Sequence, residues 1–580
     1  MKRISKIYKK LAIVCALMCG TLMSSCTDYL TIIPPGVITE EHFWQTKDDV
    51  NGVMAKAYLN LLSTDAVQKA IIWGELRADN LTFPASYNEN IKYIVEANIL
   101  DENPYTNWAI YYEAIQTANL VIERAPKVME HDPDFTEGDL RVVTGEMYAL
   151  RALAHFYLVR TFRDIPMALE SVSDDSDMPE YEQVHPLEAL DLIMADLEKA
   201  LPMVMKSGGF TSVASNYGRI TENAVLAIMA DVNLWRAAFA TYYEGQTDLV
   251  AAGDAQKYYD LCVQNCQDVL DKMDAKFEED NEKNNNRNPE KFPHNLLQNE
   301  GELEDRTEDR ISTVYNEIFG TKNSRESILE LQVEGANVDN GFARGVAGMY
   351  GTDGNRGAVV VPANFLGKYY ESDDLRAYSY TNAQSLTGGS SAGSGSSSDA
   401  TDVIVAKYQA KSSPAGDYRK SSDYDANWII YRRTDVMLMK AEALAARQSA
   451  TPEDLAEAFD IVKVINTRSR MDSTDIKKPL NGTNLTKDGV MELVLKERLL
   501  ELTFEGKRWY DLVRKALREK TTNNIKFVAD KLDSNSGVVK SKMSTIDGLF
   551  MPIYIDELRY NKLLKQNPAY QDEDETTEMN

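Results

Sequence analysis

The stretch KERLLELTFEGKRWYDLVR, which runs from Lys496 to Arg514, indicates two helices joined by a hinge. Apolar residues recur at helical spacing on both sides of Gly506. The two stripes are Leu495, Leu499 and Leu502, then Trp509, Leu512, Val513 and Ala516. Glycine reaches the left-handed conformation of a helix C-cap without a steric penalty. We therefore expect the first helix to be capped at Gly506.

Charged residues fill the positions between the two apolar stripes. They are Glu497, Arg498, Glu501, Glu505, Arg508, Asp511 and Arg514. Because acidic and basic residues are interspersed, ion pairs between helical neighbours can satisfy them. An amphipathic helix pair has too small a core to be stable alone, so both helices are expected to pack against other parts of the chain.

The segment ERLLELTFEGKRWYDLVR resembles the C-terminal signature of the SusD/RagB family, the surface nutrient-binding lipoproteins of Bacteroidetes-type bacteria. Further stretches resemble elements of the same family. They are RADN (77–80), GEMYALRALAHFYLVRTFRDIPM (145–167), NWIIYRRTDVMLMKAEALAA (427–446) and LFMPIYIDELRYNKLLKQNPAYQ (549–571). The resemblance extends from Cys26 to about Tyr570 and is interrupted mainly at 276–310 and 385–400.

The N-terminus has the pattern of a lipoprotein signal peptide over residues 1–25. Basic residues come first, and the apolar run from Leu11 to Met23 follows. That run is too short for a transmembrane helix. Met23-Ser24-Ser25-Cys26 resembles a bacterial lipobox, which predicts lipidation of Cys26; the alternative is a simple secretory signal that is cut nearby. We expect the protein to meet the membrane through lipid alone.

The composition is that of an acidic globular protein. The 580 residues are 43% hydrophobic and 26% charged, with a formal net charge of −27. Removing residues 1–25, which carry five basic residues and no acidic one, takes the charge to −32. Such a surface argues against nucleic acid, and against anionic polysaccharides as default partners, but it leaves room for a local basic patch.

The resemblance and the apolar periodicity imply a mostly α-helical fold. We expect four tetratricopeptide-like helix pairs that support a loop-rich ligand face, with a few short strands. The expected parts are an N-terminal half at 26–275, a polar insertion at 276–310 and a C-terminal half at 311–580. Strand-like pieces lie at 326–334, 357–362 and 401–409. Cys262 and Cys266, His155, and Trp428 with Trp509 are interpreted as packing residues.

Residues 73–112 are rich in aromatic residues and lack a sustained helical or strand period. Aromatic faces can stack on the apolar C–H faces of a sugar while Asn, Asp and Arg bind its hydroxyls. The candidate glycan-binding residues are Trp73, Arg77, Asp79, Asn80, Tyr87 and Tyr105, with Tyr350 from the second half. The alternative for each is a buried anchor. For a ligand contact, Trp73→Ala is expected to weaken glycan binding with little change in melting temperature.

The sequence carries no motif that demands catalysis. It has no HExxH, no Walker-type loop and no paired CxxC. Gly389 to Gly393 fits GxSxG, but it lies in a Gly/Ser run without the strand and helix that a nucleophile elbow requires. The 90 acidic residues leave a glycosidase pair open. No cofactor, no metal site and no enzymatic activity are expected.

The resemblance implies a surface-exposed, lipid-anchored protein of the outer membrane. Such a protein captures oligosaccharides and delivers them to a SusC-like TonB-dependent transporter, over which it lies as a lid with its helical scaffold facing the barrel. The alternatives are a RagB-like uptake lipoprotein that binds peptides or proteins, and a secreted glycoside hydrolase.

Overall fold

The computed structural model describes residues 43–172, 180–283, 293–299, 312–334, 344–352, 355–382, 403–410, 419, 424–470, 485–523 and 537–571. The described residues from Thr46 onward belong to one compact unit. The predicted signal peptide, Cys26 and the segment 385–400 lie outside the described residues.

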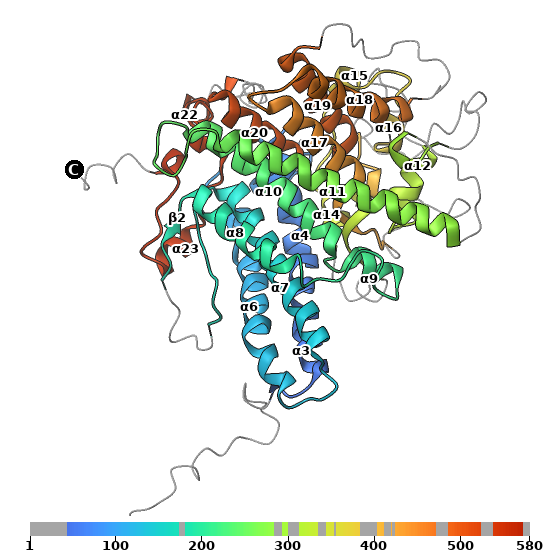
Figure 1. Ribbon diagram of the computed structural model, residues 1–580. Helices are drawn as coiled ribbons and strands as arrows, with labels where there is room; N and C mark the ends of the chain where they lie inside the picture. The colour runs from blue at the N-terminus through green and yellow to red at the C-terminus, as the bar shows by residue number, and fades with distance from the viewer. Residues whose placement is uncertain are drawn as a thin grey trace, which may run out of the picture. The chain divides into compact units, whose positions relative to one another are not determined.

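Four pairs of helices follow one another along this unit (Figure 1). The pairs are α3 (Lys47–Leu62) with α6 (Ala109–Met129), α7 (Glu137–Phe162) with α8 (Pro186–Ala200), α10 (Glu222–Tyr243) with α11 (Asp254–Lys283), and α17 (Arg433–Ala446) with α18 (Pro452–Arg468). Each pair contacts the next through α6–α7, α8–α10 and α11–α17. This serial stacking is the predicted tetratricopeptide-like scaffold.

Capping boxes fix the starts of three of these helices. Thr46, Thr136 and Thr451 each accept a hydrogen bond from the backbone of an Asp three residues later, and that Asp side chain bonds back to the cap. Each box satisfies two backbone donors that a helix start leaves unpaired. The sequence pattern Thr-x-x-Asp therefore marks these boundaries locally.

Helix α10 is mostly apolar and mostly buried, because it lies inside the scaffold. It contacts α8, α11 and α20 (Arg508–Glu519). Among the described residues it is the one helix that is long and apolar enough to cross a membrane, and 83% of its most apolar window is buried within the protein. Its hydropathy is therefore accounted for by packing in the core.

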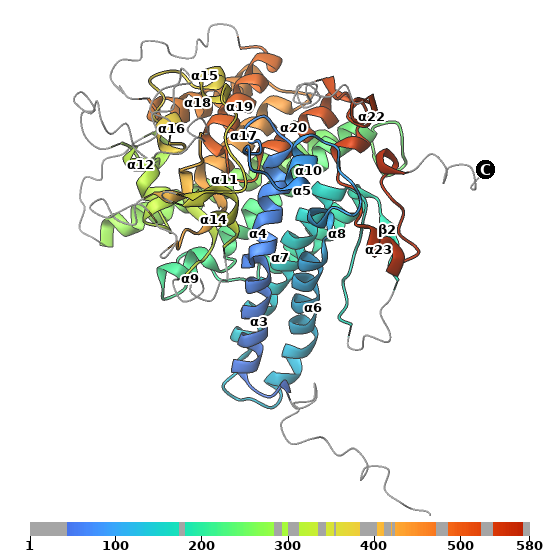
Figure 2. The ribbon, with the colours of Figure 1, turned by 180° about the vertical axis from the view of Figure 1, so that it is seen from behind.

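Shorter elements connect the helix pairs (Figures 1 and 2). The helical ones used below are α4 (Thr64–Ile71), the π-helical turn η2 (Ile72–Leu76), α5 (Glu89–Val95), α9 (Val213–Gly218), α14 (Gly345–Tyr350), α15 (Phe365–Tyr369) and α19 (Lys487–Leu502). The described residues also contain three two-stranded antiparallel sheets. They pair β1 (Ile165–Pro166) with β2 (Gln183–Val184), β3 (Ser327–Leu331) with β6 (Trp428–Arg432), and β4 (Gly351–Thr352) with β5 (Asn355–Arg356).

The strand predictions are confirmed in part. The segment 326–334 contains β3, whose Ser327 and Leu331 lie opposite Arg432 and Trp428. The segments 357–362 and 401–409 form isolated bridges in place of strands in their described parts, such as Val361 with Val403, and the second ends in a 3-10 turn at Lys407–Gln409. The family-like segment 427–446 is helical only from Arg433, because the β-branched and aromatic run before it pairs with β3.

The predicted polar insertion at 276–310 starts within a helix. Helix α11 continues to Lys283, and ion pairs between Lys276 and Asp280 and between Glu279 and Lys283 lie one turn apart along it. Such i,i+4 pairs support a helix of polar composition. The first residues of the insertion are therefore ordered helix, while most of its remainder lies outside the described residues.

The hinge in the opening stretch exists, but the helix ends earlier than expected. Helix α19 stops at Leu502, and Thr503 is its C-cap. The turn that follows contains two residues with positive φ, Phe504 at 68° and Gly506 at 71°. Gly506 has the expected left-handed conformation, three residues beyond the C-cap rather than at it.

The charged residues around this hinge are buried, and most of them pair with other elements rather than with helical neighbours. Glu501 binds Arg432 and Arg468, each at 2.7 Å. Glu505 binds Arg432 at 2.8 Å and Lys407 at 2.6 Å. The interspersed charges of the sequence therefore form a buried network that joins α19 to β6 and α18.

The packing residues of the sequence analysis are confirmed. Trp428 and Trp509 are each 2% exposed, and Cys262 and Cys266 are buried and free. His155 is fully buried, and burial lowers its pKa to about 3, which keeps the imidazole neutral.

Candidate ligand-binding face

Residues 73–80, WGELRADN, are bonded directly to the turn that follows α19. The backbone amides of Gly506 and Lys507 donate to Oε1 of Glu75 at 3.0 and 3.2 Å. The amide of Asn80 donates to the other oxygen of Glu75 and, at 2.9 Å, to the hydroxyl of Thr503. Two segments more than 420 residues apart therefore form one hydrogen-bonded unit, which we call the 75–506 clamp.

Two arginines complete the 75–506 clamp. Arg508 donates to both oxygens of Asp79, at 2.9 and 3.1 Å. The guanidinium of Arg77 lies 4.4 Å from the centre of the Trp509 ring and donates to the carbonyl of Leu549 at 2.7 Å. The RADN and FEGKRW segments, which both resemble family motifs, therefore bind each other in the folded chain.

The close approach in the clamp requires a glycine at position 74. A Cβ atom placed on Gly74 would lie 1.9 Å from the carbonyl oxygen of Gly506. That is far inside van der Waals contact, so a side chain would push the two backbones apart.

Burial dominates the electrostatics of Glu75. It raises the carboxyl pKa to about 7, although the hydrogen bonds from Asn80 and from the Lys507 amide favour the charged form. This acid therefore changes its charge near neutral pH.

The structure places five of the seven candidate residues inside the protein. They are Trp73, Arg77, Asp79, Asn80 and Tyr350. Trp73 is 1% exposed, lies 4.9 Å from the Tyr111 ring and donates to the carbonyl of Tyr105 at 2.8 Å. Tyr350 donates to the carbonyl of Phe504 at 3.1 Å. Ligand contact by these five stays a prediction, and in this arrangement they have little or no exposed surface through which to make it.

The burial of Trp73 also changes the expected result of its mutation. Removal of a fully buried tryptophan typically costs about 3–5 kcal/mol of stability because it leaves a cavity. Trp73→Ala is therefore expected to lower the melting temperature, contrary to the expectation for an exposed ligand contact.

The other two candidates, Tyr87 and Tyr105, reach the surface. Tyr87 is 41% exposed, and Phe83 meets its ring edge-on at 5.1 Å between centroids. The ammonium of Lys92 lies 4.9 Å from the same ring. Tyr105 is half-buried on a neighbouring turn, which Asn103 ties to the start of α5 through a bond to the carbonyl of Asn90.

The loop that carries Tyr87 is anchored at its base. Thr82 and Val360 form a β-bridge with two hydrogen bonds of 2.9 Å. The hydroxyl of Tyr369 donates to Asp79 at 2.5 Å, which brings the end of α15 against the same segment. We call the partly exposed rings of Phe83, Tyr87 and Tyr369 the aromatic loop face.

Sequence reasoning did not select Phe83 or Tyr369 as site residues. Phe83 lies in the aromatic-rich segment that the sequence analysis identified, so composition was a signal for it. Tyr369 comes from FLGKYYESDDLR, almost 290 residues further on, and no local pattern indicates that it lies beside Asp79.

The four helix pairs and the aromatic loop face define a helical-repeat scaffold that carries partly exposed aromatic loops. Comparison with known proteins gives the family. Residues 252–570 match the model of the SusD family, and residues 37–234 match a family described as starch-binding associating with outer membrane. The chain belongs to the SusD family.

Relatives with similar sequences span nearly the whole chain. The SusD-like protein P38 of Formosa agariphila is 25% identical over 95% of this chain and 96% of its own length. The SusD-like protein P2 of the same organism is 25% identical over 84% of this chain and 87% of its own.

Solved structures share the fold. A SusD homolog from Bacteroides thetaiotaomicron superposes with a TM-score of 0.67 at 19% identity, covering 91% of this chain and 99% of its own. A laminarin-binding SusD-like protein superposes with a TM-score of 0.60 at 18% identity, covering 91% and 100%. The predicted SusD-like fold is thus confirmed.

Proposed function

We propose that this protein is a lipid-anchored, glycan-binding protein of the outer membrane. It captures oligosaccharides at the cell surface and passes them to a SusC-like TonB-dependent transporter. The observation that carries the proposal is a partly exposed aromatic loop on an anchored base, in a chain of the SusD family. One family description reads starch-binding, and one protein of the same fold binds laminarin, which supports a glycan as the ligand.

The aromatic loop face suits a sugar for physical reasons. The Phe83–Tyr87 pair offers an apolar ring surface that can cover the C–H face of a pyranose. Lys92 and Lys368, whose ammonium groups lie 4.9 and 4.8 Å from the Tyr87 and Tyr369 rings, can donate hydrogen bonds to hydroxyls. The bridge from Thr82 to Val360 limits the movement of the loop base, so less entropy is lost on binding.

The membrane and transporter parts of the proposal rest on the lipobox at Cys26 and on the family. A lipid on Cys26 would tether the compact unit, which starts at Thr46, to the outer membrane. Copurification of a TonB-dependent transporter with the lipidated protein from outer membranes would support this assignment, and a protein recovered alone would weigh against it.

Tyr87→Ala is expected to reduce glycan binding about tenfold, because stacking on one ring contributes on the order of 1 kcal/mol or more. The chain without residues 1–26 is run through native gels that contain plant, fungal or host polysaccharides. The unmodified chain is expected to be retarded by at least one glycan and Tyr87→Ala much less. Tyr560→Ala is the matched control, because Tyr560 is 84% exposed on α23 (Ile555–Tyr560), away from the loop in sequence.

The same mixtures are assayed for new reducing ends. Retardation without cleavage supports a binding protein, whereas cleavage would favour the hydrolase alternative. Equal retardation of the Tyr87 and Tyr560 variants would remove the aromatic loop face as the binding site. If no glycan retards the protein, short peptides are the next ligands to test.

A further inference from the structure

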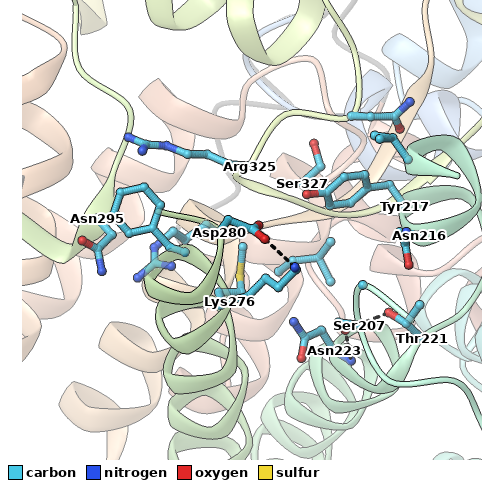
Figure 3. A pocket seen from close by; sticks show the side chains of 17 residues that line it. Ser207, Asn216, Tyr217, Thr221, Asn223, Lys276, Asp280, Asn295, Arg325 and Ser327 are labelled. Carbon is cyan, nitrogen blue, oxygen red and sulfur yellow. Dashed lines mark hydrogen bonds and ion pairs between the residues drawn. The ribbon is translucent and has the colours of Figure 1, made fainter. Parts of the chain in front are cut away.

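A pocket of about 430 Å³ lies between α9, the C-terminal part of α11 and the start of β3 (Figure 3). Its volume is within the range of small-molecule sites in proteins. None of the seven candidate glycan residues lines it, and neither do Phe83 and Tyr369. The pocket is therefore a second feature, separate from the aromatic loop face.

Two buried side chains that line the pocket have polar atoms without a partner in the described part of the chain. Asn223 is 7% exposed, and its Oδ1 accepts no hydrogen bond. Arg433 is 4% exposed, and its Nε donates none, while its Nη2 binds Asp274. Buried polar atoms are nearly always hydrogen-bonded. A ligand with both donors and acceptors would satisfy them.

The charges of the lining leave one cation unbalanced. Lys276 pairs with Asp280, and Arg433 pairs with Asp274, each at 2.6 Å. Among the described residues, Arg325 forms no ion pair with a carboxylate; it donates to the carbonyl of Leu296 at 3.2 Å and lies 4.8 Å from the Phe277 ring. A cation in this position would attract an anion.

Charged groups of both signs surround Arg325. Burial lowers the pKa of its guanidinium, and the positive charges of Arg433 and Arg468 lower it further, whereas Glu326 and Glu317 act in the opposite direction. The carboxylate of Glu326 is already bound to Arg468 at 2.6 Å. An added carboxylate would relieve the repulsion between the two guanidinium groups.

The rest of the lining fits a hydroxylated ring. Phe277, Met273 and Ile328 supply apolar surface, and the Tyr217 ring stands across from Lys276 in Figure 3. The Tyr217 hydroxyl makes no hydrogen bond to the described residues, so it is available to a ligand. Apolar walls with a few convergent polar groups are typical of a small-molecule site.

We propose that this pocket binds a sugar acid of one or two rings, whose carboxylate pairs with Arg325 and whose hydroxyls bind Asn223 and Tyr217. The proposal does not depend on glycan binding at the aromatic loop face. The acidic composition of the chain does not exclude a local basic patch, and the pocket around Arg325 would be such a patch.

Isothermal titration of the chain without residues 1–26 tests the proposal. Glucuronate and galacturonate are compared with glucose, galactose and acetate at the same ionic strength. Binding of at least one sugar acid, about tenfold or more tighter than of its neutral sugar or of acetate, is the expected result. Equal binding of acetate would indicate an adventitious anion site only, and no binding of either sugar acid would overturn the proposal.

Variants of two pocket residues then test whether the sugar acid binds in this pocket. Arg325→Gln is expected to weaken binding of the sugar acid about tenfold while leaving binding of the neutral sugars unchanged. Tyr217→Phe is expected to weaken binding of the sugar acid several-fold, because it removes a hydrogen bond to a sugar hydroxyl. Arg559→Gln is the matched control, since Arg559 pairs with Asp556 one turn away on the surface and does not line the pocket. Unaltered affinity in both pocket variants would refute the site. The Tyr87→Ala variant should bind the sugar acid normally, so failure of one proposal is distinguishable from failure of the other.

Discussion

Glu75 is the residue at which the two halves of the 75–506 clamp meet. Its buried carboxyl accepts two backbone amides from the turn and one side-chain amide from Asn80. The pKa of about 7 means that the folded protein keeps a proton on Glu75 up to neutral pH, whereas the unfolded chain releases it near 4.5. Folding is therefore linked to proton binding between pH 4.5 and about pH 7.

Glu75→Gln tests this linkage. Between pH 4.5 and 7 the folded state holds more protons than the unfolded state, so the contribution of Glu75 to the free energy of unfolding falls as pH rises and is constant above about pH 7. Glutamine resembles the protonated acid. The stability of Glu75→Gln relative to the unmodified chain is therefore expected to rise by on the order of 2–3 kcal/mol from pH 4.5 to 7.5. Urea unfolding at several pH values measures it.

The exposed Glu244 provides the control for this experiment. Glu244→Gln is expected to keep a constant difference from the unmodified chain over the same range. A constant difference for Glu75→Gln as well would contradict the raised pKa.

Gly74→Ala is expected to destabilise the protein by about 3 kcal/mol or more, because the new methyl group would overlap the Gly506 carbonyl. Gly52 is a matched site on the exposed face of α3, where an added Cβ meets nothing within 4 Å. Gly52→Ala should be stabilising by about 0.5–1 kcal/mol through helix propensity. Equal effects of the two substitutions in thermal or urea unfolding would contradict the close approach.

Among the elements, α19 combines buried apolar residues with buried charges. Glu497, Glu501 and the neighbouring Glu505 find arginine and lysine partners on α16 (Leu375–Ser379), β6, α18 and the 403–410 segment. A buried ion-pair network is sensitive to loss of one member, because the remaining charges keep their desolvation cost.

Arg432→Ala is expected to cost about 3–5 kcal/mol of stability, since it removes a fully buried guanidinium from both Glu501 and Glu505. Arg559→Ala, which breaks only an exposed pair with Asp556, should change stability by less than about 0.5 kcal/mol. Denaturant unfolding compares the two, and a similar small change in both would show that the network does not stabilise the fold.

The elements differ in how much of them the sequence could predict. Helix starts such as Thr46 and Thr136 are encoded within four residues, and the serial helix pairs follow from periodicity and family resemblance. The start of β6 depends on its pairing with β3 about 100 residues away, which no local pattern contains.

The candidate site was harder to predict for the same reason. Trp73 and Tyr87 are both aromatic residues in an irregular segment, and only the tertiary structure shows that one is enclosed by Tyr111 and Phe162 while the other reaches solvent. Tyr369 joins the face through Asp79, a contact that periodicity cannot indicate.

In the whole molecule, contacts between the two halves predicted from the sequence are extensive. Helix α10 packs on α20, and η2 packs on α20 as well. Arg77, fully buried, finds its backbone acceptors at Gly548 and Leu549. The N-terminal half therefore contains buried groups whose partners all come from the end of the chain.

A fragment covering 46–275 is accordingly expected not to fold cooperatively. It would expose the apolar surface of α10 and remove the partners of Arg77, Asp79 and Glu75 that come from the second half. Circular dichroism should show helix that melts over a broad range, whereas 46–571 should melt in one sharp transition. A sharp transition of the fragment alone would show that the first half is an independent domain.

The 75–506 clamp also sets an order of events during biosynthesis. Because a chain is made from its N-terminus, the WGELRADN segment must wait for more than 420 further residues before Thr503, Gly506 and Arg508 exist to bind it. Contacts this distant in sequence form slowly. Until they form, apolar surface that is prone to aggregation stays exposed. The newborn chain would therefore need protection by a holding chaperone until residues 503–508 arrive, and a premature stop codon near residue 500 would yield an aggregating product rather than a shortened binder.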